Sequence, residues 1–141
     1  MTEITYHLLQ SDEGWRLDRV ADEVFDHAIR PDCLAGLLAA PDHLLVVAVS
    51  DGLVVGQCAG VIHRHADALP DLCIDNLGVA PACRRKGIAR AMFGRLCIAA
   101  RERGCMEAWV ATEPDNGPAR RLYRSLADDD GETFVMYEFG L

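Results

Sequence analysis

The residues best suited to chemistry form a cluster of cations just before a helical pattern. Arg84, Arg85 and Lys86 are followed by Gly87, and apolar residues then recur at helical spacing over residues 88–99. The first turn of a helix has backbone N–H groups without acceptors, and the helix dipole favours negative charge there. Three cations at a helix start oppose that dipole unless an anion is bound. The stretch therefore predicts an anion-binding turn.

The charge of the chain is unevenly placed. Residues 84–103 contain seven Lys or Arg and one Glu, a net charge of +6. Since the whole chain has a net charge of −8, the remaining residues have a net charge of −14. General nucleic-acid binding would need a broad basic face, which an acidic chain with one basic element lacks. The distribution fits a small polyanion at the turn and a cationic second ligand elsewhere. Arg95, Arg101 and Arg103 are interpreted as a solvated helix face.

The elements that must position these residues follow from apolar periodicity and turn residues. Strands are predicted at residues 3–9, 44–49, 53–62, 72–79, 106–112 and 133–139. Helices are predicted at 12–28, from Pro31 to 40, from 88 to a stop at Gly104, and at 119–126. Strands before and after a central crossover helix predict a mixed α/β sheet with helices packed on it.

Length and composition limit the class of protein. A chain of 141 residues is expected to form one domain, residues 1–141. The longest apolar run, 44–49, is too short to span a bilayer, and the first residues lack the pattern of a signal peptide, so we expect no membrane partner and a cytoplasmic location. Six cysteines without a C-x-x-C pair predict free thiols, mostly buried. No metal is expected, because His63, His65 and Asp67 lack further ligands.

The motifs resemble those of the GCN5-related N-acetyltransferase (GNAT) superfamily. Residues 84–89 match its R/Q-x-x-G-x-G/A signature, and Leu77-Gly78-Val79 matches its fourth strand. Downstream, Asn116, Ala119 and Leu122-Tyr123 match its second cofactor-side motif. The resemblance implies an α/β (α+β) GNAT fold. In this fold a mixed central sheet is splayed between its fourth and fifth strands, and about four helices flank it.

The resemblance also implies acetyl-CoA as the acyl donor. Backbone N–H groups of residues 85–90 would face its pyrophosphate, Gly87 would let the backbone approach, and Leu77 and Val79 would pair with its pantetheine arm. The implied cofactor-binding residues are Leu77, Gly78, Val79, Arg84, Arg85, Lys86, Gly87, Ile88, Ala89, Arg90, Asn116, Ala119 and Tyr123.

Two residues are candidates for catalysis. The resemblance implies that Tyr123 is the general acid that protonates the leaving thiolate, although from the sequence alone it would be an amphipathic core tyrosine. Asp75 is the candidate acceptor of the amine proton, and Asn76 would orient the amine. Strand alternation lets only one of this pair point into a cleft unless a bulge intervenes. A solvent-facing Asp75 is the alternative.

Within the superfamily the chain looks most like the small aminoglycoside 3-N-acetyltransferases of the fortimicin/gentamicin type. It shares their compact length, the acidic fourth strand, and the L-x-V-x-x-x-x-R-R-x-G-I-A run from Leu77 to Ala89. It departs from them at Asn76, where that group has aspartate. The likeness implies an antibiotic-resistance enzyme that transfers acetyl directly to a cationic amine in a ternary complex. Asp75, Asn76, His27, Glu113 and Tyr137 are the candidate substrate-binding residues.

Alternatives remain open at the level of the sequence. The acceptor could instead be a polyamine, a small metabolite or a peptide, since the same acidic surface would attract any cation. A non-catalytic acyl-CoA-binding regulatory module is the alternative from another class, and the presence of Asn116 and Tyr123 argues against it. The family often forms homodimers, and no apolar stripe in the sequence demonstrates one here.

Overall fold

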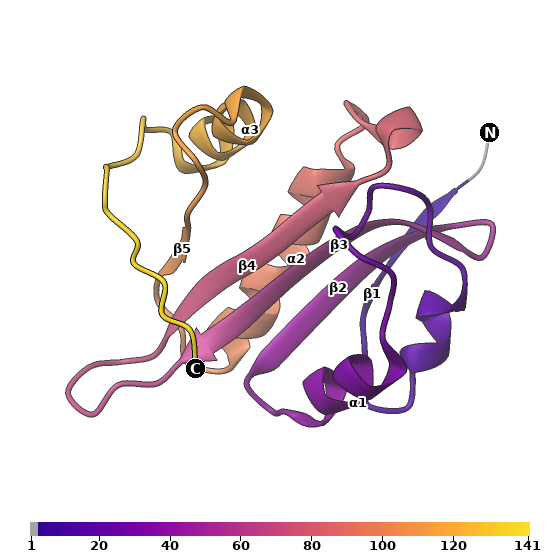
Figure 1. The fold of residues 1–141 in the computed structure, drawn as a ribbon, viewed down its shortest axis with the longest axis horizontal. Helices are drawn as coiled ribbons and strands as arrows, with labels where there is room; N and C mark the ends of the chain where they lie inside the picture. Colours follow the sequence, from indigo (N-terminus) through magenta and orange to yellow (C-terminus); the bar gives the residue numbers. More distant parts are fainter. Residues whose placement is uncertain (1–2) are drawn as a thin grey trace. The chain divides into compact units, whose positions relative to one another are not determined.

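A five-stranded sheet organises the first of two units in the chain. The structure is a computed structural model that describes residues 3–141; residues up to 111 belong to unit 1, and Thr112–Leu141 form unit 2 (Figure 1). The strands are β1 (Ile4–Leu8), β2 (His43–Ser50), β3 (Leu53–His63), β4 (Asp71–Val79) and β5 (Ala108–Val110). They lie side by side in chain order, antiparallel except for the parallel pair β4–β5. This mixed sheet confirms the predicted fold class.

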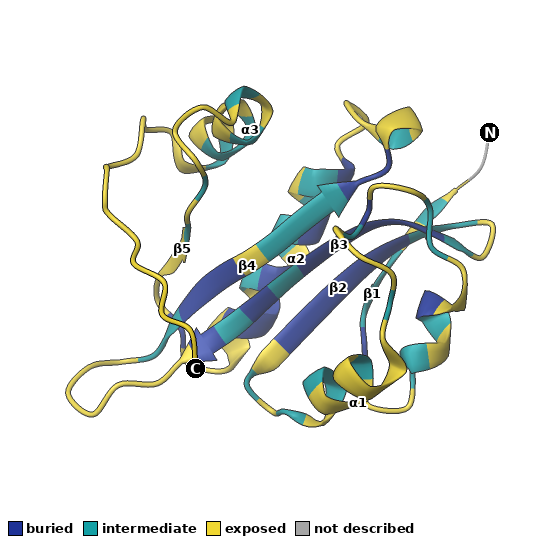
Figure 2. Cartoon of the chain, in the orientation of Figure 1, coloured by how far each residue is buried: buried dark blue, intermediate teal, exposed yellow. Residues whose placement is uncertain are grey.

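The helix α2 (Ile88–Glu102) covers one face of this sheet, and β2 and β3 are the most deeply buried strands (Figures 1 and 2). Met92 and Leu96 are fully buried on it, each contributing about 1.5–3 kcal/mol by the area removed from water. A methyl group at Gly60 would lie 3.1 Å from a Leu96 methyl carbon, so glycine in β3 allows close packing. Gly104, with a φ of +96°, ends the helix as predicted.

The opposite face carries a turn of 3-10 helix, η1 (Gly14–Asp18), an irregular segment 19–30, and α1 (Pro31–Ala39). The prediction of a helix over 12–28 is wrong. The backbone there is bound to the sheet: the Val54 N–H donates to the Arg19 carbonyl, and the Ala21 N–H donates to the Val54 carbonyl. These tertiary hydrogen bonds outweigh a weak helical preference over residues 12–28, which contain four Asp and two Val residues.

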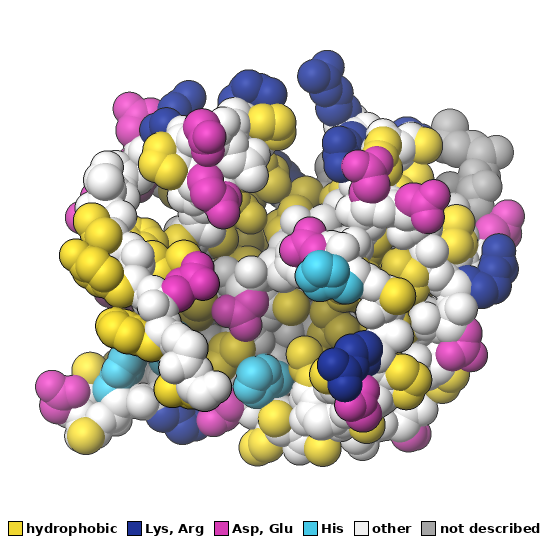
Figure 3. Space-filling view, viewed as in Figure 1, with side chains coloured by type: hydrophobic (Ala, Val, Ile, Leu, Met, Phe, Trp, Pro, Cys, Tyr) yellow, Lys and Arg dark blue, Asp and Glu magenta, His cyan; other side chains and the backbone are white. Residues whose placement is uncertain are grey.

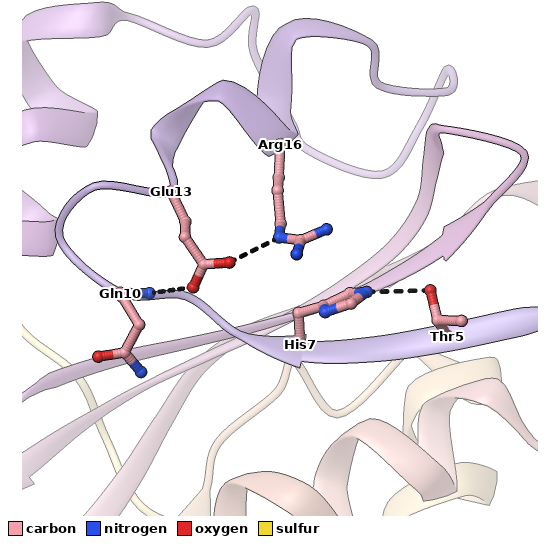
Figure 4. A network of polar contacts seen from close by, with 5 residues as sticks. All are labelled: Thr5, His7, Gln10, Glu13 and Arg16. Carbon is pink, nitrogen blue, oxygen red and sulfur yellow. Dashed lines mark hydrogen bonds and ion pairs between the residues drawn. The ribbon is translucent and has the colours of Figure 1, made fainter.

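Two groups of polar contacts lie where the chain passes from β1 to η1 (Figure 4). The Glu13 carboxylate accepts hydrogen bonds from the Gln10 backbone N–H and from Arg16 Nε, both at 2.9 Å. The Arg16 bond is the main reason that the pKa of Glu13 is lowered. Burial, aided by the charge of Arg16, lowers the pKa of His7, whose Nε2 lies 2.9 Å from Thr5 Oγ1. The Glu13 contacts therefore hold the turn that follows β1.

Unit 2 contains α3 (Gly117–Ala127), and its remaining residues form no further helix or strand. The predicted strand at 133–139 is therefore wrong. Its alternating apolar residues are exposed, from 60% at Phe134 to 82% at Phe139. Alternation makes a segment suitable for a sheet, but a strand also needs a neighbouring strand to bind its backbone. Unit 2 contains no strand that could do so within its described residues.

The described residues thus contain three α-helices, against about four predicted, and the difference is the unformed helix at 12–28. The other predicted strands and helices are present with ends shifted by a few residues. Within the part of the chain that the structure describes, no helix has the length and apolar character needed to cross a membrane.

Candidate functional site

The turn between β4 and α2 has an unusual backbone conformation. After a short 3-10 turn, η2 (Pro81–Cys83), Arg85 and Gly87 both have left-handed backbones, with φ of 62° and 80°, on either side of Lys86. A methyl group at Gly87 would meet no atom within 4 Å, so this side of the turn is open. Alternating backbone conformations of this kind turn successive N–H groups toward one side and form anion-binding concavities.

The same turn provides donors and positive charge. Among the described residues, no acceptor is recorded for the backbone N–H groups of residues 85–89, and the first hydrogen bond of α2 runs from the Ala91 N–H to the Gly87 carbonyl. The side chains of Arg85 and Lys86 are exposed beside these donors. Arg84 is different, because its Nε donates to the Val79 carbonyl at 3.1 Å and closes the turn. Backbone donors, a helix start and two exposed cations together suit a phosphate ligand.

One edge of β4 is unpaired next to this turn. β5 pairs with β4 only at Leu72, Cys73 and Ile74, and beyond these the described residues place no strand on that edge. The predicted pantetheine-binding residues 77–79 lie in the unpaired stretch. An edge of this kind can bind an extended ligand as an added strand.

A bulge in β4 decides where Asp75 and Asn76 point. On β3 the neighbours Ala59 and Gly60 pair with Asn76 and Ile74, so Asp75 is an extra residue without a partner. Its Oδ1 accepts from the thiol of Cys73, two residues earlier, at 3.6 Å. Cys73 pairs with Val61, and Asn76 pairs with Ala59. The odd-numbered side chains of β3, which include Val61 and Ala59, face away from α2, and paired residues share a face. The bulge therefore brings Asp75 and Asn76 to the same face.

That face is the one seen in Figure 3, where acidic and histidine side chains gather over the sheet of unit 1. Asp75 is exposed and Asn76 half-buried. His27 is exposed on the segment 19–30, which crosses the same face. Unit 1 therefore brings together a carboxylate, an amide and a segment bearing a histidine, next to the unpaired edge of β4.

Two of the buried cysteines are poor nucleophiles. All six are free. Burial raises the pKa of Cys58 to about 12, and burial with the nearby Asp75 charge raises that of Cys73 to about 11. Both thiols remain protonated near neutral pH, and a thiol is a poor acyl acceptor compared with its thiolate.

The remaining predicted residues lie in unit 2. Asn116 caps α3, because its Oδ1 accepts from the Ala119 N–H at 3.2 Å. Tyr123 is half-buried on the same helix, on the side shared by Ala119, Leu122 and Leu126. Glu113 and Tyr137 are exposed outside the helix. Asn116 therefore has a structural task within this unit, and the roles of the other three remain predictions.

An open depression of about 630 Å³ lies between η1 and α1 in unit 1. None of the predicted site residues lines it. Its walls are mostly apolar and include Leu17, Val20, Ile29, Leu34 and Leu38. Ser11 and Asp18 are its polar lining side chains, and it lies apart from the anion-binding features, so we place the site at β4 and the turn.

The comparison with family models identifies the class. The model of the "Acetyltransferase (GNAT) family" matches residues 3–127, and the chain therefore belongs to this family. It is an acetyltransferase, and its acyl donor is acetyl-CoA.

Individual relatives share moderate identity. The curated protein "Aminoglycoside N(6')-acetyltransferase type 1" of Salmonella typhimurium (strain LT2) is 25% identical over 101 residues, which cover 68% of this chain and 70% of that protein. Among solved structures, an aminoglycoside acetyltransferase from an uncultured soil metagenomic sample (HMB0005) has a TM-score of 0.83 at 22% identity, covering 99% of both chains. A second soil metagenomic enzyme (meta-AAC0020), in complex with sisomicin, has a TM-score of 0.84 at 19% identity, covering 98% of this chain and 96% of that one. These structures establish the likeness of fold.

The observed turn fits acetyl-CoA. When bound, acetyl-CoA supplies an activated acetyl thioester. The open side of Gly87, the N–H groups of residues 85–89, and the cations Arg85 and Lys86 suit its phosphates. The unpaired edge at 77–79 suits its extended arm. Within the turn Arg84 is an exception, because its side chain contacts the protein backbone, as the side chain of Asn116 does in α3.

One polar residue near this site was missed by the sequence analysis. Gln57 is fully buried in β3, on the same face as Asn76. Gln57 is the single polar residue in the predicted strand at 53–62, and a polar residue among apolar ones in a strand can indicate a special role. It was passed over because one glutamine carries no motif.

Proposed function

We propose that this chain is a cytoplasmic enzyme that acetylates an amino group of an aminoglycoside with acetyl-CoA as donor, by direct transfer in a ternary complex. The observation that carries the proposal is the bulge at Asp75, which presents a carboxylate on the strand that leads into the proposed phosphate-binding turn. An ammonium group is attracted by such a carboxylate and must lose a proton before its nitrogen can attack a thioester. The name of the Salmonella relative supports an aminoglycoside as the acceptor.

The position acetylated is proposed to be the 6'-amino group. The sequence resemblance favoured the 3-N type, and the comparisons do not confirm that subtype, because the relative is named for the 6' position. The departure at Asn76 from the 3-N pattern agrees with this choice. Product analysis by two-dimensional NMR decides between the two, and acetylation at the 3-amino group would restore the first expectation.

Each residue has a proposed chemical task. Asp75 takes the proton that the acceptor ammonium loses, directly or through water, and Asn76 hydrogen-bonds the acceptor. As the C–N bond forms and the C–S bond breaks, Tyr123 gives its phenolic proton to the leaving thiolate. His27, Glu113 and Tyr137 are proposed to contact the acceptor. With Cys58 and Cys73 held as thiols, a covalent acyl-enzyme on either is disfavoured.

The test is a thiol-release assay with acetyl-CoA and a panel of aminoglycosides, polyamines and basic peptides. We expect release with aminoglycosides that carry a free 6'-amino group and none with 6'-hydroxyl analogues. Release only with polyamines or peptides would replace the proposed acceptor. Binding of acetyl-CoA without release for any amine would indicate a regulatory module instead.

A further inference from the structure

Gln57 is the only fully buried polar residue among the described residues, and its side chain makes one hydrogen bond across the sheet face. Its Nε2 donates to the backbone carbonyl of Val24 at 3.2 Å, joining residues 33 positions apart. Its Oε1 is buried without a partner in the described structure. An unpaired buried carbonyl is costly, and the other buried positions of β3 are apolar or glycine, so stability alone does not account for glutamine here.

A second observation concerns the same carbonyl group. Gly78 in β4 pairs with Gln57, and a methyl group at Gly78 would lie 2.2 Å from the Val24 oxygen. Only glycine leaves room for the backbone of the segment 19–30 to lie on the sheet at this point. Glu23, directly before Val24, has a left-handed φ of 65°, which is uncommon for a residue with a side chain. The buried amide of Gln57 and the backbone of Gly78 therefore both lie against the Val24 carbonyl, and the unusual backbone conformation is at the residue before it.

The orientation of the Gln57 amide follows from this contact. With the amide reversed, its oxygen would face the Val24 oxygen and repel it. The observed orientation satisfies Val24 and leaves Oε1 unpaired. Gln57 Oε1 thus lacks a hydrogen bond, while Nε2 holds the segment 19–30 at a defined place.

The crossing point lies next to the proposed acceptor site. Gly78 is two residues from Asn76 on the same strand and face, a rise of about 7 Å, and Asp75 is the bulged residue beside Asn76. The segment held at Val24 also carries Asp26 and His27, both exposed. It therefore crosses the face of the sheet that also presents the carboxylate proposed to receive the amine proton.

We propose that Gln57 is a positioning residue for the acceptor amine: it holds the Val24 carbonyl so that residues 22–28 form one wall of the acceptor site beside Asp75. The inference rests on the proposed function, because it concerns the amine that Asp75 deprotonates. It predicts that loosening this contact weakens acceptor binding while the cofactor turn, on other residues, is unaffected.

The test variant is Gln57→Met, which keeps the length of the side chain and removes both the donor and the unpaired oxygen. We expect the rate of amide hydrogen exchange in residues 22–28 to rise about tenfold, because the free energy of one hydrogen bond corresponds to about a factor of ten in an equilibrium constant. The KM for the aminoglycoside should rise by a similar factor. The KM for acetyl-CoA, kcat at saturating acceptor and the melting temperature should stay near the values of the unchanged protein.

Two further variants keep the test decisive. Gly78→Ala pushes against the Val24 carbonyl from the other strand and should raise the acceptor KM as well. Cys58→Ala alters an equally buried neighbour on the α2 side, so it should lower the melting temperature and leave the acceptor KM unchanged.

Three outcomes would overturn the inference. They are unchanged exchange in Gln57→Met, increased exchange with an unchanged acceptor KM, and a parallel loss of stability and of all kinetic constants. If the unchanged protein acetylates no amine, the proposed function fails, and the exchange rates alone then decide whether Gln57 holds the segment.

Discussion

At the scale of single residues, one extra amino acid in β4 changes what the strand presents. Without a bulge, Asp75 and Asn76 would point to opposite faces. With Asp75 unpaired between Ile74 and Asn76, both face away from α2. A carboxylate and an amide thereby share one face beside an unpaired strand edge, an arrangement suited to binding and deprotonating an amine.

Asp75→Asn should remove the proton acceptor and keep the shape of the side chain. We expect kcat/KM for the acceptor to fall by about 100-fold, the lower end for general-base catalysis, with an unchanged KM for acetyl-CoA. Steady-state kinetics measures both. Asp67→Asn, an equal loss of charge at an exposed loop residue, is the control and should have little effect. Equal activity of the two variants would exclude Asp75 as the base.

Tyr123→Phe should slow the step in which the thiolate leaves. We expect kcat to fall by about 100-fold, because the phenylalanine ring keeps the shape but has no proton to donate. Tyr6→Phe is the matched control: it removes the hydroxyl from a half-buried tyrosine whose ring lies 5.8 Å from the Arg95 guanidinium, a contact the phenylalanine retains. Turnover of Tyr123→Phe equal to that of the unchanged protein would reject the assignment.

Gly87→Ala tests the backbone of the anion-binding turn. A left-handed φ of 80° costs a residue with a side chain about 1–2 kcal/mol, although no atom lies within 4 Å to clash. We expect a melting temperature lower by a few degrees and weaker binding of acetyl-CoA, measured by calorimetry. Gly94→Ala, in the interior of α2 and equally free of clashes, should instead stabilise the protein. A similar response of both variants would contradict a special conformation at Gly87.

At the scale of elements, the face opposite α2 is covered by the least regular part of unit 1. Residues 19–30 follow the sheet through hydrogen bonds at Arg19, Ala21 and Val24 instead of forming a helix. A segment held by a few backbone contacts can be moved by single substitutions, whereas α2 is held by a buried apolar side. Differences in acceptor preference are therefore expected to arise from this segment.

The stability that the connection from β1 to η1 contributes should depend on pH. The pKa of Glu13 in the folded chain is lowered below its ordinary value of 4.5, so its stabilisation is present above pH 4.5 and is lost as the pH falls through the lower folded pKa. Glu13→Gln should cost about 0.5–1 kcal/mol at pH 7. Melting temperatures at pH 7 and near pH 3 should show this difference shrinking in acid. A difference that is independent of pH would contradict the role of the Glu13 charge.

At the scale of the whole molecule, charge and burial are distributed differently along the chain. The basic segment 84–103, at +6, contrasts with −14 on the rest, which separates an anion-binding turn from acidic surfaces suited to a polycation. All of the fully buried side chains in the described structure precede Thr112. The hydrophobic core therefore belongs to unit 1.

A fragment of residues 1–111 should consequently fold without the rest of the chain. It contains the five strands and α2, and we expect a single cooperative thermal transition by circular dichroism. It should not transfer acetyl, because it lacks Tyr123, the proposed general acid. A peptide of residues 112–141 should be mostly unfolded, since an isolated helix of 11 residues is marginal in water. A fragment that melts without cooperativity would show that unit 2 is required for folding.

Most features of the proposed cofactor site could be predicted from local sequence. Apolar periodicity predicted β4 and α2, three cations and a glycine marked the turn between them, and Gly104 marked the end of the helix. These features depend on neighbours within a few residues, whose backbone and side-chain preferences act before any distant contact forms. The amino acid types alone therefore determined that a glycine-containing turn with three cations, proposed to bind phosphate, precedes α2.

The features of the proposed acceptor side were decided only by tertiary structure. The bulge at Asp75 depends on the register between β3 and β4, and the course of residues 19–30 depends on Val54 and on Gln57, 33 residues from its partner Val24. The alternation at 133–139 likewise predicted a strand, and none forms without a neighbouring strand. Register, partner and burial are properties of segments distant in sequence, so no local pattern could show them.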